Sequence, residues 1–260
     1  MKTMKSWKTI LLTGVLALGL LALSGCGDDP VAPKETYEVD AATAEQWSLQ
    51  AVDMISQMAA AVPPVAEGDF STLNQNKNAG EPVWDEEQMA WVLDQTMTFT
   101  EGDPPTSTGE TRMSIWIQFR GPEGPLPAAL GATEMEFRES AGMTMHSDNE
   151  QGVSDLDFDL ATGMVVAFLD NGYGMTGTGQ ALINASTTAE GRTQRMNLAM
   201  SWGLDLVAPL EGCPLGTAFV QVGQYRTEVV YDGEGSAAWT LTGPSYSASG
   251  TENVPCGAPM

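Results

Sequence analysis

Residues 196–206, MNLAMSWGLDL, decide the fold that this sequence predicts. Large apolar side chains occupy every second position of the stretch, and small or polar residues occupy the positions between them. Strict alternation of this kind is typical of a β-strand with one buried face and one wet face. The face expected to be buried consists of Met196, Leu198, Met200, Trp202, Leu204 and Leu206.

The same alternation recurs on both sides of this stretch, and predicted turns separate the runs at Ala161-Thr162-Gly163, Asn171-Gly172 and Asp232-Gly233-Glu234-Gly235. Short turns between successive strands favour an antiparallel meander. We therefore predict a mainly β fold, in which the meander forms a strongly curved sheet or an up-and-down barrel, with a β-sandwich as the alternative. The expected strands lie near residues 88–100, 111–120, 133–147, 151–160, 163–170, 173–186, 192–207, 217–231, 236–243 and 246–254.

Residues 41–64 predict one N-terminal amphipathic helix. Thr43 and Gln46 fit a capping box at its start, and Pro63-Pro64 stop it. Its apolar residues recur at spacings of three and four, so they share one helix face. They are Trp47, Ala51, Met54, Ile55 and Met58. The apolar face of such a sheet has a larger area than the apolar patches that soluble proteins leave exposed. We therefore expect this helix to cover part of that face.

The first residues of the chain carry an export signal. A lysine-rich leader precedes a short apolar stretch at residues 10–23, which is well short of the ~20 residues that a membrane-spanning helix needs. The stretch runs directly into Leu23-Ser24-Gly25-Cys26. This tetrapeptide resembles the lipobox of the bacterial lipoprotein family. The resemblance implies that Leu23, Ser24 and Gly25 are recognition residues, and that Cys26 becomes the lipidated N-terminus after cleavage.

The resemblance implies the signal peptide, and the composition and periodicity of the remaining sequence predict the other segments. The expected segments are a signal peptide at 1–25, an acidic and proline-containing tether at 26–40, the helix at 41–64 and an antiparallel β domain at 65–260. We expect the mature protein to be held in the cell envelope by its lipid. Gly27 is not the aspartate that acts as a retention signal, so the outer membrane is favoured if the cell is Gram-negative.

The charge of the chain excludes several classes of partner. Removal of the signal, which contains three lysines and no acidic residue, leaves 8 basic residues against 34 acidic ones and a formal charge of −26. A surface this acidic repels phosphate backbones and anionic headgroups. We therefore expect no binding of nucleic acid, and attachment to the membrane through the lipid anchor alone.

Two cysteines remain besides the lipid-bearing one, namely Cys213 and Cys256. Exported proteins commonly reach an oxidising compartment, where cysteines pair. Neither cysteine has a nearby Cys or His at the spacing of a metal site. We predict a disulfide between them, with Cα atoms ~4.4 to 6.8 Å apart.

Asp155, Asp157 and Asp159 occupy one face of a predicted strand, at roughly 6.5 to 7 Å from one to the next. Three carboxylates in this arrangement favour either a solvated strand face or a calcium site. We expect no cofactor, with calcium as the alternative. We expect all three aspartates to point to solvent, opposite the apolar residues that alternate with them.

Two functional hypotheses follow from the predicted sheet, and both are non-catalytic. In the first, sheet and helix hold an apolar small molecule or lipid against flexible methionines, and Met113, Met196, Met200 and Trp202 line the pocket. In the second, the interior is solid, and the acidic outer face meets an envelope protein or divalent cations. Hydrolysis comes third. The sequence has a single histidine, His146, and no G-x-S-x-G motif that would supply a nucleophilic serine.

Overall fold

The computed structural model describes residues 82–101, 106–149, 152–189, 192–254 and 256, together with five positions between residues 46 and 55. The described residues form one antiparallel sheet of 12 strands. The strands are β1 (Val83–Asp85), β2 (Ala90–Glu101), β3 (Ser107–Gly121), β4 (Gly124–Leu126), β5 (Glu134–Asn149), β6 (Gly152–Leu169), β7 (Gly172–Ala189), β8 (Arg192–Pro209), β9 (Leu215–Val222), β10 (Tyr225–Asp232), β11 (Ser236–Thr242) and β12 (Ser247–Asn253).

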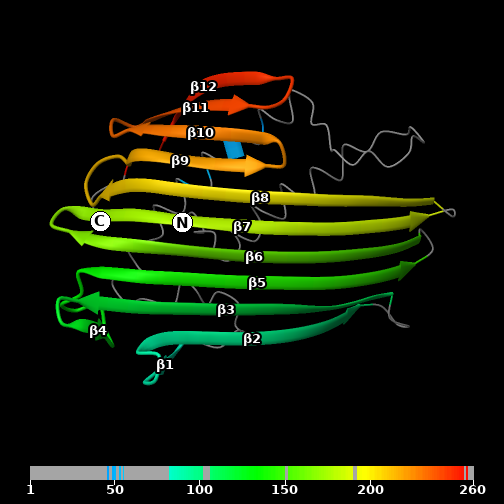
Figure 1. Cartoon of the computed structure of the whole chain (residues 1–260), viewed down its shortest axis with the longest axis horizontal. Helices are drawn as coiled ribbons and strands as arrows, with labels where there is room; N and C mark the ends of the chain where they lie inside the picture. Colours follow the sequence, from blue (N-terminus) through cyan, green and yellow to red (C-terminus); the bar gives the residue numbers. More distant parts are fainter. Residues whose placement is uncertain are drawn as a thin grey trace, which may run out of the picture.

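The strands neighbour one another in chain order, except that β4 lies off this path and pairs with β3. Figure 1 shows them side by side, from β1 at one edge to β12 at the other, with β5 to β8 as the long central strands. The sheet does not close on itself. The predicted antiparallel meander is therefore confirmed, as one open sheet rather than a closed one or a two-sheet sandwich.

One predicted turn is wrong. The sequence Ala161-Thr162-Gly163 has turn-like residues, but β6 continues through it without a break. The reason is that the apolar alternation continues across it from Leu160 to Met164, both of which are buried. Continuous pairing keeps all of these apolar side chains on one face, because side chains alternate along an unbroken strand.

One predicted strand is in fact a hairpin. Residues 217–231 contain most of β9 and most of β10, which pair in register from Val222 and Tyr225 onward. Gly223 and Gln224 form the two-residue connection, and Gly223 has a φ of 56°. Glycine adopts this left-handed conformation without the steric cost that a side chain brings. A single glycine in an alternating run therefore hid the turn from the sequence analysis.

The inward face of the sheet carries the apolar core. On β8 five of the six predicted positions are buried and Met196 is half-buried, so the predicted orientation of this strand is confirmed. The indole of Trp202 lies across Gly179 of β7, where a Cβ atom would come within 2.2 Å of the ring. Phe99 lies over Gly109 in the same way. Glycine on one strand thus makes room for an aromatic ring of its neighbour.

The predicted helix is described at only five positions, all of them helical: Gln46, Leu49, Gln50, Asp53 and Ile55. Ile55 is fully buried and belongs to the same apolar cluster as the inward residues of the sheet. Its burial there agrees with the expected contact between helix and sheet. The remaining predicted contact residues Trp47, Met54 and Met58 lie outside the described residues.

The N-terminal predictions also fall outside the described residues. These comprise the signal peptide, the tether and the lipobox residues Leu23, Ser24, Gly25 and Cys26. Among the helical positions that the structure describes, none belongs to a helix long and apolar enough to cross a membrane.

The predicted cysteine pair is confirmed at disulfide distance. Cys213 follows β8 and Cys256 follows β12, and their Cα atoms lie 4.2 Å apart, slightly below the expected range. Because β9 to β12 lie between the two cysteines in the chain, the bond ties the last strand of the sheet back to the end of β8.

Candidate functional site

The residues predicted to line an apolar pocket lie on the inward face, at different depths. Met200 is 3% exposed and Trp202 is 2% exposed, so both are enclosed by other core side chains. Met113 and Met196 are half-buried. The core therefore encloses Met200 and Trp202, whereas Met113 and Met196 are less completely covered.

The less covered part of the inward face lies toward the end of the sheet where β6 and β8 begin. A cross-strand row of half-buried side chains marks it, with one residue from each of five strands. These residues are Phe99, Met145, Leu156, Ala185 and Met196. We call them the half-buried apolar row.

The three aspartates of β6 point to solvent, as predicted, while Phe158 and Leu160 of the same strand are buried. Asp155 Oδ1 lies 2.7 Å from His146 Nδ1, and Asp155 Oδ2 accepts a hydrogen bond from the Ser186 hydroxyl at 3.4 Å. Among the described residues, no three or more Asp, Glu, His and Cys side chains are arranged to hold a metal ion. The geometry therefore fits the solvated-face interpretation and gives the calcium interpretation no support.

Asp155 and His146 belong to a polar hollow of about 710 Å³ on the outward face. Two adjacent cross-strand rows form it, and every outward side chain in them can make hydrogen bonds. We call it the distal hollow. Its rows are Thr98, Glu110, Thr144, Asp157, Asn184 and Asn197, and Thr100, Thr108, His146, Asp155, Ser186 and Arg195.

A longer depression crosses the middle of the same face. Two hollows of about 790 and 430 Å³ adjoin there, because both are lined by Gly177, Thr178, Leu204 and Asp205. We call the pair the central trough. A single cross-strand row runs along it, with one residue from each of seven strands. The row is Trp116, Arg138, Gly163, Thr178, Gly203, Phe219 and Glu228.

An arginine stacked on an aromatic ring lies at each end of the central trough. The guanidinium carbon of Arg138 is 4.7 Å from the centre of the Trp116 ring, and that of Arg226 is 3.9 Å from the centre of the Phe219 ring. Each arginine also pairs with a carboxylate two residues away in its own strand. Stacking and ion pairing together orient both guanidinium groups over their rings.

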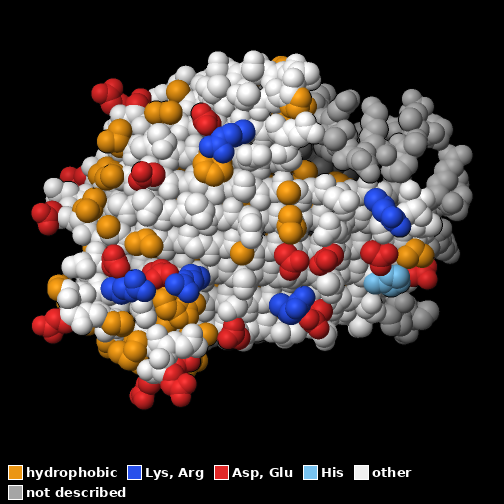
Figure 2. Space-filling view, viewed as in Figure 1, with side chains coloured by type: hydrophobic (Ala, Val, Ile, Leu, Met, Phe, Trp, Pro, Cys, Tyr) orange, Lys and Arg blue, Asp and Glu red, His pale blue; other side chains and the backbone are white. Residues whose placement is uncertain are grey.

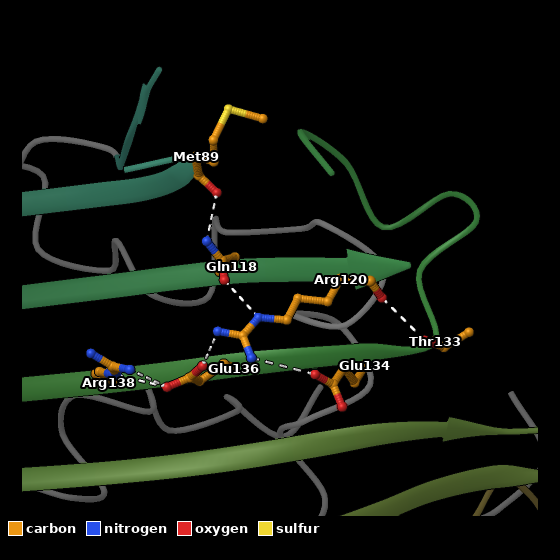
Figure 3. Close-up of polar contacts among 7 residues, drawn as sticks. All are labelled: Met89, Gln118, Arg120, Thr133, Glu134, Glu136 and Arg138. Carbon is orange, nitrogen blue, oxygen red and sulfur yellow. Dashed lines mark hydrogen bonds and ion pairs between the residues drawn. The ribbon is translucent and has the colours of Figure 1, made fainter. Parts of the chain in front are cut away.

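A hydrogen-bonded network holds the Trp116 end of the trough in place (Figure 3). Glu136 accepts from Arg138 Nε at 2.7 Å and pairs with Arg120 Nη2 at 2.7 Å. Arg120 Nε in turn donates to Oε1 of the buried Gln118 at 2.7 Å, and Gln118 Nε2 donates to the carbonyl oxygen of Met89 at 3.1 Å. The charged groups are thus anchored to the backbone at the start of β2.

Figure 2 shows the outward face as a whole. Its charged side chains lie in small groups that often combine both signs, and uncharged polar side chains and backbone cover most of the centre. The alternation along each strand predicts a wet face here, but it does not predict the trough. Trp116 and Phe219 are aromatic residues at wet positions of their strands, which is the signal that could have found its two ends.

Comparison with protein-family models, with curated proteins and with solved structures finds no match to this chain.

Proposed function

We propose that this protein is a lipid-anchored envelope lipoprotein that acts by binding an envelope component through the outward face of its sheet. The placement of the hollows is the observation that carries the proposal. The distal hollow and the central trough both open on the outward face, whereas Met200 and Trp202 of the inward face are enclosed in the core. Ligand sites are concave surfaces with convergent polar groups, and the outward face has both features.

Binding without catalysis is the simplest use of these side chains. In a serine hydrolase the histidine stands between the serine and the aspartate, so that the imidazole can take the proton of the hydroxyl. Here Asp155 stands between Ser186 and His146, and the serine hydroxyl donates to the carboxylate. This order orients three polar side chains but does not activate a nucleophile.

Anchoring through Cys26 leaves the sheet free to meet its partner. The tether at 26–40 reaches up to ~45 Å when fully extended, which is enough to hold the domain clear of the headgroups. Cys26→Ser removes the only thiol of the lipobox-like sequence, so we expect a soluble or unprocessed product. Fractionation of cells into membrane and soluble parts measures this. Equal partitioning of mutant and wild type into membranes would refute the anchor.

Photo-crosslinking in the intact envelope tests the choice of face. A photoreactive residue at Thr178 in the trough, or at Asn184 in the distal hollow, should give adducts with a component of the host envelope. The same residue at Val207, which is exposed on β8 outside both hollows, is the matched control. Adducts that are equally strong at all three positions, or absent from the two hollow positions, would contradict the proposal.

A second candidate function is favoured by the half-buried apolar row. Its methionine, phenylalanine and leucine side chains form an incompletely covered surface that an apolar small molecule or lipid would complete. Native mass spectrometry of protein purified from its host tests this candidate. A bound apolar mass, in addition to the covalent lipid on Cys26, would support it. A mass that extraction with organic solvent leaves unchanged would exclude it.

A further inference from the structure

We infer that the central trough binds a neutral glycan, laid across the strands as an extended chain. This inference rests on the proposed function, because it names the class of envelope component that the outward face would bind. Four features support the inference, namely the length of the trough, its polar lining, its charge balance and Gly163.

The length of the trough suits an extended chain better than a small molecule. Five inter-strand spacings separate Trp116 on β3 from Phe219 on β9, or about 24 Å. Between these two aromatic residues the central row contains Arg138, Gly163, Thr178 and Gly203, and the Phe219 ring lies across Gly203. The trough is therefore long, shallow along its axis and bounded at each end by an arginine stacked on an aromatic ring.

The chemistry of the trough suits a ligand rich in hydroxyl groups. Backbone donors and acceptors in the middle of the sheet are used by neighbouring strands, so a ligand on this face must be recognised by side chains. Thr178 and Asp205 offer hydroxyl and carboxylate groups in the middle, and Glu136 and Glu228 offer carboxylates at the ends. Sugar rings have hydroxyl groups for such partners, and apolar C–H faces that pack beside the two arginine–aromatic pairs at the ends of the trough.

The charge of the trough argues for a neutral glycan. Arg138 and Arg226 are each neutralised by a glutamate at 2.7 and 3.0 Å, which leaves the carboxylate of Asp205 as the excess charge between them. The mature chain as a whole is also acidic, with a formal charge of −26. An acidic polysaccharide would be repelled by the Asp205 carboxylate and by the net charge of the chain. A neutral polysaccharide has no charge to be repelled, so its binding would not be weakened in this way.

Gly163 is the residue that packing alone does not explain. It pairs regularly with Arg138 on one side and Thr178 on the other, and its φ lies outside the left-handed range. A Cβ atom added to it would meet nothing within 4 Å. Glycine in the interior of a strand costs about 0.5 to 1 kcal/mol relative to alanine, and often marks close approach of a ligand. Gly163 keeps the floor of the trough open.

Binding of the full-length, detergent-solubilised protein to an array of neutral and acidic oligosaccharides tests the inference. We expect neutral glycans to bind in preference to acidic ones. Gly163→Val should weaken binding roughly tenfold or more by filling the trough, and Trp116→Ala should do so by removing one end. The thermal midpoint of Gly163→Val should equal or exceed that of the wild type, because β-branched residues suit strands.

Gly174→Val is the matched control, because Gly174 lies on β7 outside the trough and a Cβ there would make ordinary contacts at 3.7 Å. This variant should bind glycans as the wild type does. The inference is overturned if no neutral glycan on the array binds, if acidic glycans bind better, or if Gly163→Val binds as well as Gly174→Val. Crosslinks at Thr178 that persist without glycan binding would leave the proposed function standing and remove this inference alone.

Discussion

Gly179 and Gly163 lie on the neighbouring strands β7 and β6, but they serve opposite faces of the sheet. A Cβ atom on Gly179 would strike the indole of Trp202 at 2.2 Å, whereas one on Gly163 would meet nothing within 4 Å. On the inward face the missing side chain makes room for an aromatic ring that belongs to the core. On the outward face it leaves open space in the floor of the central trough. The same residue type thus completes packing on one face and preserves a concave surface on the other.

The two faces also differ in how much a buried or exposed charge would change the free energy of unfolding. Met200→Asp would bury an unpaired carboxylate and should lower the free energy of unfolding by about 3 to 5 kcal/mol. Ser201→Asp places the same group on the outward face and should change it by less than about 0.5 kcal/mol. Urea denaturation of both variants measures the difference. Equal stabilities would show that the two faces of β8 are assigned wrongly.

Loss of the disulfide should lower the stability of the protein without changing binding at the outward face. Replacing Cys213 and Cys256 together by serine opens a loop whose ends are 43 residues apart, and should cost about 4 kcal/mol in the chain-entropy model. Neither cysteine lines the trough or the distal hollow. The double variant should therefore melt at a lower temperature and still give the Thr178 crosslink below its melting point. Loss of that crosslink in the folded variant would mean that the bond shapes the outward face.

Replacing Gly179 and Gly163 by alanine, one at a time, should change the stability of the protein in opposite directions. Gly179→Ala forces Trp202 to shift and should cost about 1 to 3 kcal/mol. Gly163→Ala removes backbone freedom from the unfolded chain at a site with open space, and should add up to about 1 kcal/mol. Chemical denaturation of the two variants measures the sign. A loss of stability in Gly163→Ala would mean that packing, rather than a ligand, requires this glycine.

The smallest effect is expected in the turn between β10 and β11, which belongs to neither hollow. Backbone N–H groups of Glu234 and Ser236 donate to Asp232, and these hydrogen bonds hold the pKa of its carboxyl below the usual value. A lowered folded-state pKa stabilises the protein above the pKa of the unfolded chain, about 3.9, and this contribution is lost as the pH falls.

Asp232→Asn should therefore melt slightly below the wild type at neutral pH. The two melting temperatures should converge as the pH falls below about 4, because the wild-type carboxyl then takes up a proton. Thermal melts across this pH range measure the gap. A gap that widens toward acid pH would contradict the assigned direction of the pKa shift.

Much of the fold was predictable because alternation along a strand is a local property. The orientation of Met200 and of Asp155, the antiparallel meander and the pairing of the two cysteines were all expected from residue order, and the structure confirms them. The break predicted at residues 161–163 was wrong, because turn-like residues there outweighed an alternation that continues through them. Short elements such as β1 and β4 were missed, since three residues cannot display a period.

The sequence by itself determined which side chains lie on each face of each strand. Only the tertiary structure decided which of them meet across the sheet. Trp116 and Phe219 are about a hundred residues apart, and they share one row because the register of five successive strand pairings brings them into line. Register depends on every turn length and pairing in between. The period of a single strand contains no information about its lateral neighbours, and the central trough is made entirely of such neighbours.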